Sequence, residues 1–458
     1  MLRRSLLAIS LAVGLIRLVD PDVVVGADPT PSGAVFYVSP GGNGADGTTW
    51  TTAWTDMNQI NWAAVPAGAT IVVDGGSSPC SVSPYDFQPA TPNPGVTCGQ
   101  RYSPLTVGQN SVTIVRSTET GRNGTVVIDG GRDTPLPYCY QTSYSATSGA
   151  AYGIDFGSHS GVVIDGRSRS GIVVRGARNG VRMGPGGNDT LRNMELFDNG
   201  YPTTIAGGYN SDGNDILMGG QNNTYDRLLV HDGGQDELHS DSTGYSEAGS
   251  SVTNSWMGAM RENPLYPGEP FNDRQAVATD CTHADGVQIF APATTMSGLT
   301  IDHDVFGPGT NQGLYPSDRR TGTAFDNVRV TNTLFLDVAR HNIITDNPVN
   351  GWVLDHDTIF ATQGGFELPS NGSNTITNVI KFGGYVSSGG TWSASGDIWY
   401  GGDPLPGSAT NVNPNFVSAP TGNLPSFASL RAANLSPLSG GSAGSPLHSF
   451  ADLLARIP

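Results

Sequence analysis

The sequence has 458 residues, of which 37% are hydrophobic and 14% are charged, with 62 glycines and 31 prolines. Elongated β folds reach this length as one unit. Frequent glycine and proline without a three-residue period indicate many turns rather than a collagen helix. The net charge of −17, without a basic stripe to neutralise phosphates, argues against nucleic acid as a partner.

Residues 1–27 have the pattern of an export signal. Arg3 and Arg4 precede an apolar run over 6–16, and the small residues 25–27 resemble a cleavage site. The apolar run is too short to cross a membrane, and no other segment is a candidate. We therefore expect a secreted, extracellular protein that has no membrane span and is a monomer.

The four cysteines suit an oxidising compartment. Cys80 and Cys98 flank one proline-rich loop and are the expected disulfide. Cys139 and Cys281 either pair with each other or stay separate, because spacing alone does not determine connectivity.

Residues 28–111 are expected to form an N-terminal cap and the first strands. Trp54, Met57, Ile60 and Trp62 follow one another at roughly helical spacing and predict an amphipathic capping helix over 52–64. The apolar run at 69–73 predicts a strand that ends in a glycine turn.

Residues 112–410 repeat one pattern of short apolar strands separated by polar turns. Such a unit cannot bury its apolar face alone, whereas stacked units close a continuous core. Three short strands per unit, without helices between them, predict an all-β fold of the parallel β-solenoid type. A C-terminal capping segment is expected over 411–458. Repeated strands begin near residues 153, 180, 215, 237, 286, 313, 342 and 365.

Over residues 36–445 the chain resembles the right-handed parallel β-helix proteins of the pectate-lyase-like superfamily. The strand at 36–40 with the segment after it is similar to that family's N-terminal cap, and 413–417 with 435–438 is similar to its closing segment. The resemblance implies a right-handed parallel β-helix that binds saccharide along one parallel sheet. It implies no single reaction, because the family includes lyases, hydrolases, epimerases and non-catalytic binders.

Two strings concentrate acids, histidines and amides where an apolar strand begins, at 234–241 and 281–290. Neighbouring coils of a solenoid lie ~4.8 Å apart, so residues in equivalent positions form ladders. Taking Leu238, Val287, Leu314 and Ile343 as inward residues fixes a register. It predicts an outward row of His239, Gln288, Tyr315 and Ile344, and a corner row of Asp236, Asp285, Gln312 and His341.

Asp236 and Asp285, adjacent in this register, have several possible roles. Two close carboxylates can share a proton, can hold calcium together with Asp241, or can act as acid and nucleophile of a retaining glycosidase. Aspartate at a solenoid corner also caps turns by accepting hydrogen bonds from backbone N–H groups. His239 and His283 beside them are candidate general acids or bases.

Arginines close to these strings are candidates for neutralising a uronate carboxylate, which makes the adjacent proton easier to remove. Arg319 and Arg320 end one strand, and Arg340 opens the next. The resemblance to the superfamily implies an arginine or lysine base for a lyase, and no lysine lies in this region. The residues expected to contact substrate are Glu237, Gln288, Tyr315, Arg340, His341 and Glu367.

His303 and His356 occupy the position that Asn193, Asn254 and Asn332 hold in other units. We therefore predict structural roles at a turn for both histidines. The longer segments 242–251 and 261–282 carry Tyr245, Tyr266 and Phe271, which are candidate sugar-stacking residues or ordinary loop residues.

The sequence therefore predicts a secreted polysaccharide-cleaving enzyme with a polysaccharide substrate and calcium as the candidate cofactor. A polysaccharide lyase acting by β-elimination on an acidic polysaccharide is the first hypothesis. The alternatives are a glycoside hydrolase that uses the paired aspartates and a non-catalytic carbohydrate-binding or cell-surface β-helix.

Overall fold

A computed structural model describes most of the chain after the predicted export signal. The chain divides into two units, Met1–Thr30 and Pro31–Pro458, and every described residue belongs to the second. No helix among the described residues is long and apolar enough to cross a membrane. The described residues are 33–80, 99–131, 150–205, 208–240, 247–259, 285–290, 296–317, 324–338, 340–361, 364–369, 372–389, 391–406, 410–420, 433–437 and 443–456.

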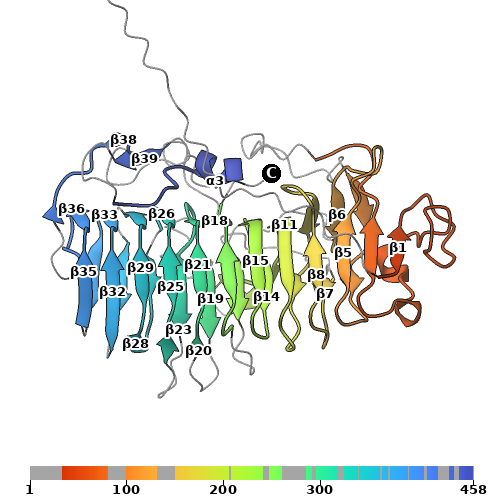
Figure 1. Ribbon diagram of the computed structural model, residues 1–458, viewed down its shortest axis with the longest axis horizontal. Coiled ribbons are helices and arrows are strands. Elements are labelled where there is room, and N and C mark those ends of the chain that lie inside the picture. Colours follow the sequence, from red (N-terminus) through yellow and green to blue (C-terminus); the bar gives the residue numbers. More distant parts are fainter. Residues whose placement is uncertain are drawn as a thin grey trace, which may run out of the picture. The chain divides into compact units, whose positions relative to one another are not determined.

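One sheet of the second unit contains ten strands that pair in parallel (Figure 1). Each strand contributes one coil of the fold. The strands are β4 (Leu105–Thr106), β7 (Tyr152–Asp155), β10 (Asn179–Arg182), β14 (Ile216–Met218), β16 (Leu238–Ser240), β19 (Asp285–Phe290), β23 (Gln312–Ser317), β27 (His341–Ile344), β31 (Gly365–Leu368) and β34 (Tyr385–Ser388).

A second sheet of 22 strands consists of two parallel ladders joined through the long strands β11 (Thr190–Phe197) and β15 (Thr224–His231). The first ladder adds β1 (Val35–Val38), β2 (Thr70–Val73), β5 (Thr113–Arg116), β8 (Val163–Asp165), β17 (Ser251–Thr253), β21 (Thr300–Asp302), β25 (Arg329–Thr331), β29 (Val353–Asp355), β32 (Ser373–Thr377) and β35 (Thr391–Ser395). The second adds β3 (Gln100–Tyr102), β6 (Val126–Asp129), β9 (Ile172–Arg175), β18 (Trp256–Gly258), β22 (Val305–Phe306), β26 (Leu334–Leu336), β30 (Thr358–Phe360), β33 (Ile380–Phe382), β36 (Ile398–Tyr400) and β37 (Thr410–Asn411).

Smaller elements lie outside these ladders. They are the antiparallel pair β12 (Tyr201–Ile205) and β13 (Gly208–Asp212), the parallel set β20 (Met296–Ser297), β24 (Phe325–Asp326) and β28 (Val349–Asn350), the pair β38 (Phe416–Ser418) and β39 (Asn434–Pro437), the 3₁₀ turns η1 (Met57–Gln59) and η2 (Trp62–Ala64), and the helix α3 (Phe450–Arg456).

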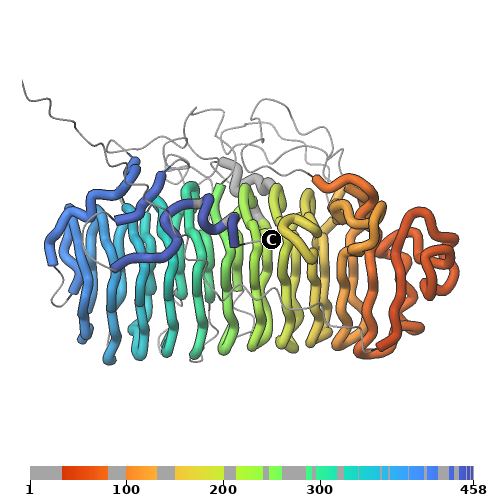
Figure 2. The backbone as a smooth tube through the Cα atoms, turned by 45° about the horizontal axis from the view of Figure 1, so that its top comes forward, coloured from red at the N-terminus to blue at the C-terminus, as the bar shows by residue number. Residues whose placement is uncertain are grey.

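The chain visits the three ladders in turn, which defines a parallel β-helix. After β16 it passes through β17 and β18 before β19 returns to pair with β16 in parallel. The strands β17 and β18 pair with their own equivalents one coil later, β21 and β22. Figure 2 shows the coils following one another in chain order. The predicted fold, a parallel β-helix as the resemblance implied, is therefore confirmed.

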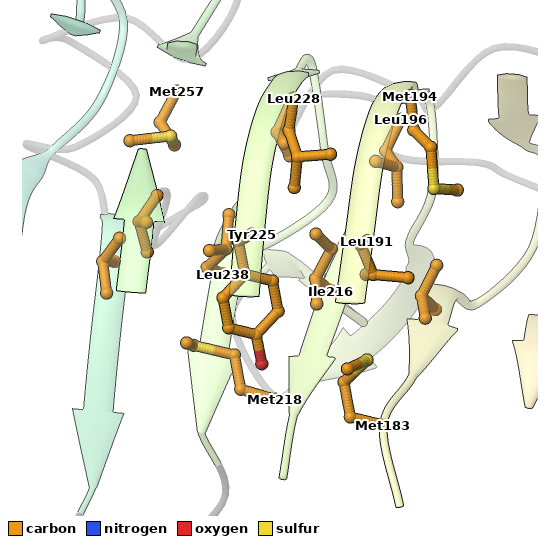
Figure 3. Close-up of a cluster of buried hydrophobic side chains, with 14 of the residues drawn as sticks. Met183, Leu191, Met194, Leu196, Ile216, Met218, Tyr225, Leu228, Leu238 and Met257 are labelled. Carbon is orange, nitrogen blue, oxygen red and sulfur yellow. The ribbon is translucent and has the colours of Figure 1, made fainter. Parts of the chain in front are cut away.

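Apolar side chains from all three ladders meet inside the coils (Figure 3). Leu238, Leu191 and Leu228 come from the three ladders, and each is completely buried. Burying such a side chain contributes about 1.5–3 kcal/mol relative to leaving it exposed. The core is continuous because each coil supplies the same inward positions as its neighbours.

The predicted amphipathic helix over 52–64 is not confirmed, because the segment forms the two turns η1 and η2 instead. Trp54, Met57 and Ile60 are spaced three residues apart, which is also the period of a 3₁₀ helix. All three are buried in the core cluster of the first coils. The carboxylate of Asp56 accepts hydrogen bonds from the backbone N–H of Met57 and from Ser103, so it fixes the turn locally. The segment packs on the core as expected, but with a different backbone.

His303 and His356 lie at the turn between the two ladders of the 22-stranded sheet, after β21 and β29 respectively. This turn confirms the structural role predicted for both residues. Both residues have a positive φ, 58° and 55° respectively, as does Asn332 with 56°. Nδ1 of His303 lies 2.8 Å from Asp302 Oδ2, and the Nδ2 of Asn332 donates to the other oxygen of Asp302 at 2.9 Å. The repeated Asp-His-Asp string is therefore a turn ladder.

The C-terminal segment packs against an apolar row on the outer side of the 22-stranded sheet. Leu447 and Leu453 join a buried cluster with Leu229, Trp256 and Leu334. Ser445 of this segment makes two hydrogen bonds that dock it on two different coils. They run from Ser445 N to Thr358 Oγ1 at 2.8 Å and from Ser445 Oγ to the Asn332 carbonyl at 2.6 Å.

Candidate functional site

The register predicted for the ten-stranded sheet is the observed one. Leu238 pairs with Val287, and Val287 pairs with Leu314. Leu314 then pairs with Ile343. All four residues are completely buried. The spacing of the inward aliphatic residues was therefore sufficient to align four coils.

The outward row of this sheet contains His239, Gln288 and Tyr315 in consecutive coils. His239 keeps 12% of its side chain exposed, whereas Gln288 and Tyr315 are 1% and 6% exposed as residues. The row is therefore more enclosed than an open groove over these coils. Farther along, Ile344 pairs with Glu367, whose side chain is 47% exposed.

The corner row is a ladder of side chains that cap the backbone of the next coil. Asn214 Oδ1 accepts a hydrogen bond from Asp236 N at 3.2 Å. Asp236 Oδ1 accepts from Asp285 N at 3.0 Å, and Asp285 Oδ1 accepts from Gln312 N at 3.1 Å. Asp236 and Asp285 are completely buried. The corner-capping role anticipated for aspartate is thus present, whatever further role either carboxylate has.

Asp236 also forms a pair with His239. Its second oxygen, Oδ2, lies 2.8 Å from Nδ1 of the imidazole. A carboxylate at Nδ1 fixes the ring orientation and leaves Nε2 as the nitrogen that can exchange a proton with a ligand. Since the corner ladder holds the carboxylate, the orientation of the His239 ring is fixed as well.

Glu237, expected to contact substrate, occupies an inward-pointing position. Its equivalents in the next two coils are Gly286 and Gly313, where a Cβ would lie 2.5 Å from a ring atom of Phe306 and 2.9 Å from one of Phe335. Glu237 is completely buried. Burial raises its pKa well above the usual value, and the neighbouring Asp215, Asp236 and Asp285 raise it further. Glu237 therefore belongs to the interior rather than to the outward row.

Aromatic rings line the outward row next to His239. Phe290 contacts both His239 and Tyr315 edge to face, with ring centroids 5.5 and 6.4 Å apart. The Tyr315 hydroxyl donates to Asp346 Oδ2 at 2.8 Å. Our sequence reasoning missed Phe290 and Asp346. Phe290 is the last residue of β19 and lies two positions after Gln288, so the alternation of a strand places both side chains on the same face. This alternation was sufficient to predict Phe290 as a member of the outward row.

A second histidine on this sheet lies beside a carboxylate. Nε2 of His341 is 3.5 Å from Glu367 Oε2, and the ring of Tyr385 packs edge to face on the imidazole at 5.8 Å. Burial lowers the pKa of His341, and the nearby Arg340 lowers it further. This histidine therefore favours the neutral form at neutral pH.

Several predicted site residues lie outside the described residues: Asp241, His283, Arg319, Arg320, Tyr245, Tyr266 and Phe271. The same holds for Cys98, Cys139 and Cys281, so the disulfide between Cys80 and Cys98 stays a prediction. Arg340 is described and exposed, at the turn before β27.

The predicted calcium site includes Asp241, which lies outside the described residues, so the site stays a prediction. Within the described ranges, no three His, Cys, Asp or Glu side chains converge as metal ligands. Asp236 is bonded through both carboxylate oxygens, and Asp285 uses one oxygen on the next coil. Calcium takes six to eight oxygen ligands, so this pair alone cannot supply them.

A buried charged cluster that we did not predict lies on the 22-stranded sheet. His231 contacts Asp232 at 2.7 Å through Nδ1 and Glu195 at 3.1 Å through Nε2. Its ring stacks between Phe197 and Trp256. Burial lowers the pKa of His231, but the hydrogen bonds with Asp232 and Glu195 outweigh this effect and raise the pKa to about 9. The available signal was a charged or titratable residue among the apolar residues that end each strand, Glu195 within Met-Glu-Leu-Phe of β11 and His231 after Leu-Leu-Val of β15.

The protein is thus a parallel β-helix whose ten-stranded sheet carries the histidine–carboxylate pair of His239 and Asp236. No family model matches the chain, and no curated protein matches it. Among solved structures, it is similar to pectate lyase Pel9A, with 13% identity over 91% of this chain and 88% of that one and a TM-score of 0.40. A rhamnogalacturonan lyase matches with 11% identity over 91% and 96% and a TM-score of 0.36. A GH87 α-1,3-glucanase from Streptomyces thermodiastaticus matches with 12% identity over 75% and 61% and a TM-score of 0.32.

Proposed function

We propose that the protein is an extracellular polysaccharide lyase that cleaves an acidic polysaccharide by β-elimination. The observation that carries the proposal is the pair formed by Asp236 and His239. It joins a rigidly capped carboxylate to a partly exposed imidazole on the outward row of one sheet. Such a pair suits proton abstraction next to a carbonyl group.

His239 takes the proton from the uronate carbon that bears the carboxylate. The proton is taken up at Nε2, and Asp236, which lies at Nδ1, stabilises the resulting imidazolium. A buried carboxylate partner does the same in other histidine bases. The electron pair left on carbon forms a double bond to the neighbouring ring carbon, and the bond from that carbon to the glycosidic oxygen breaks. The leaving oxygen takes up a proton, which leaves one unsaturated and one ordinary chain end.

Neutralisation of the uronate carboxylate is assigned to arginine. Arg319 and Arg320 are the candidates proposed from the sequence, whereas Arg340 opens the strand three coils beyond that of His239 and is assigned to a carboxylate farther along the polymer. Gln288 and Tyr315, one and two coils from His239 in the same row, are assigned to substrate contact. Calcium at Asp236 and Asp285 would need ligands beyond the described residues, such as Asp241, so no step is routed through it.

Hydrolysis by the two aspartates is the second candidate. Adjacent coils place Asp236 and Asp285 at ~4.8 Å backbone spacing, which is compatible with a retaining pair. The lyase is preferred because each of these carboxylates accepts a backbone hydrogen bond from the following coil. A carboxylate committed in this way is a poor nucleophile.

Product chemistry tests the proposal. Purified protein is incubated with pectate, alginate and an α-1,3-glucan, and both ultraviolet absorbance and new reducing ends are followed. We expect unsaturated products from one acidic polymer and none from the neutral glucan. Reducing ends without ultraviolet absorbance would favour hydrolysis, and binding without any cleavage would leave a non-catalytic carbohydrate-binding protein. Chelation followed by calcium addition tests the cofactor.

A further inference from the structure

In the corner ladder of the ten-stranded sheet, side-chain-to-backbone hydrogen bonds link successive coils as far as Asp285 and are not continued by the side chain of the next residue, Gln312. Asn214, Asp236 and Asp285 each use a side-chain oxygen to accept the backbone N–H of the next coil. Gln312 is the next residue of this row. Its Oε1 is buried and has no hydrogen-bond partner within the described part of the chain.

Three neighbours of Gln312 share this property. Both amide atoms of Gln288, Oδ1 of Asn311 and Nδ1 of His341 are buried without a hydrogen-bond partner in the part of the chain that the structure describes. Gln288, Asn311 and Gln312 are 1%, 2% and 6% exposed. We call these four residues, Gln288, Asn311, Gln312 and His341, the polar patch.

The polar patch covers three consecutive coils, because Asp285 in the strand of Gln288 pairs with Gln312, and Gln312 pairs with His341. Side chains of the corner row reach the outward row, as His341 does toward Glu367 and Asp236 toward His239. The patch therefore faces the same side of the sheet as His239. At ~4.8 Å per coil it begins one coil from His239 and ends about 14 Å away.

An unpaired polar group in a protein interior destabilises the folded state. Buried polar groups are otherwise almost always paired, and exceptions gather where a ligand or a reaction needs them. The patch gathers four such residues in adjacent coils, directly after a ladder in which each corner residue has one oxygen paired with the next coil. We take them as groups that a bound molecule would match.

We propose that the polar patch is a binding subsite for the hydroxyl groups of an uncharged face of a saccharide unit, in the coils that follow that of His239. Amides and a neutral imidazole offer both donors and acceptors, which hydroxyl groups satisfy and a carboxylate does not. The four residues of the patch carry no cationic side chain, and two charged residues near His341, Glu367 and Arg340, have opposite signs and offset each other. This inference rests on the proposed function for its ligand class, while its geometry is independent of the reaction.

Substitution of Gln312 separates binding from folding. Gln312→Met removes an oxygen that has no hydrogen-bond partner among the described residues, so the Tm is expected to stay unchanged or rise. Asn214→Leu is the matched control from the same row. It removes an oxygen that caps Asp236 N, so its Tm is expected to fall while binding is retained. Gln288→Met provides a second variant of the patch.

Calorimetric titration of each variant uses oligosaccharides from pectate, alginate and α-1,3-glucan, alongside thermal unfolding. We expect wild type to bind at least one of them, and Gln312→Met to bind it at least tenfold more weakly with an undiminished Tm. Binding by Gln312→Met within twofold of wild type, or a Tm that falls as in Asn214→Leu, would overturn the subsite.

The outcomes also separate the two proposals. Cleavage by a wild-type protein whose binding does not depend on Gln312 leaves the lyase and removes the subsite. Binding that depends on Gln312 without cleavage of any polymer leaves the subsite and removes the lyase. Wild type that binds none of the three oligosaccharides contradicts both.

Discussion

The same residue pair, histidine beside aspartate, occurs in this protein with two different functions that its surroundings decide. Asp236 is completely buried, and its Oδ1 accepts a hydrogen bond from the following coil while Oδ2 faces His239. Asp302 keeps 31% of its side chain exposed, and His303 beside it occupies a turn with positive φ. In our proposal the fixed carboxylate orients its histidine for proton transfer, whereas the exposed one at a turn supports the backbone.

Asp302 is expected to stabilise the fold at neutral pH but not in acid. Burial raises its pKa, yet hydrogen bonds from His303, Thr331 and Asn332 outweigh this and lower the pKa to about 2. A depressed folded-state pKa gives stability that is present above about pH 4 and is lost as the pH falls through 2. We expect Asp302→Asn to reduce the free energy of unfolding at pH 5 by about 1–2 kcal/mol, allowing for solvent screening.

Denaturant unfolding of wild type and Asp302→Asn at pH 5 and pH 2.5 measures this effect. The difference between the two proteins should shrink toward the lower pH. Equal stabilities at pH 5 would show that the turn ladder does not depend on the charge.

At the scale of elements, the C-terminal segment is expected to stabilise the outer face of the helix. Leu447 is completely buried in a cluster with residues of several coils. Leu447→Ala should therefore reduce the free energy of unfolding by about 2–4 kcal/mol, the usual cost of a cavity. Val417, which is 54% exposed, is the control, and Val417→Ala should change stability by less than about 0.5 kcal/mol. Similar effects of the two substitutions in denaturant unfolding would refute the packing role.

The strands and their register were predictable because each coil repeats an aliphatic residue at the same inward position. Leu238, Val287 and Leu314 align three coils without further information. The turn histidines were predictable from their asparagine equivalents. In each case the sequence repeats, so one coil predicts the next.

The features that were not predictable depend on contacts between a residue and other coils, which differ from one coil to the next. The direction of Glu237 follows from glycines in the next coils and from rings behind them. The burial of Gln288 depends on what covers the sheet rather than on its own strand. The 3₁₀ turns over 57–64 share their apolar spacing with an α-helix, so the pattern does not distinguish the two.

The whole molecule is expected to be more stable in mild acid than in mild base. Burial raises the pKa of Asp189 and Glu247 to about 7 and that of Asp215 to about 8. The folded state therefore retains protons that the unfolded chain loses near pH 4. The resulting stability is complete below pH 4 and is lost as the pH rises through 7 to 8.

Denaturant unfolding at pH 5 and pH 8 should show a loss of about 3 kcal/mol or more over this range. Asp215→Asn keeps an acceptor for Asn199 Nδ2, which donates to Asp215 Oδ1 at 2.7 Å, and should flatten the dependence. Stability that is constant or rises between these two pH values would contradict the role of the buried acids.

The central claim is that Asp236 and His239 together move the proton in a β-elimination. The most direct measurement is kcat/KM, from ultraviolet absorbance, on the acidic polymer that wild type cleaves. We expect His239→Ala to lower it by about 10²–10⁴-fold and Asp236→Asn to lower it by at least tenfold. His303→Ala, which removes the equally paired turn histidine, should stay within twofold. Full activity of His239→Ala, or no unsaturated product from any acidic polymer with wild type, would contradict the account.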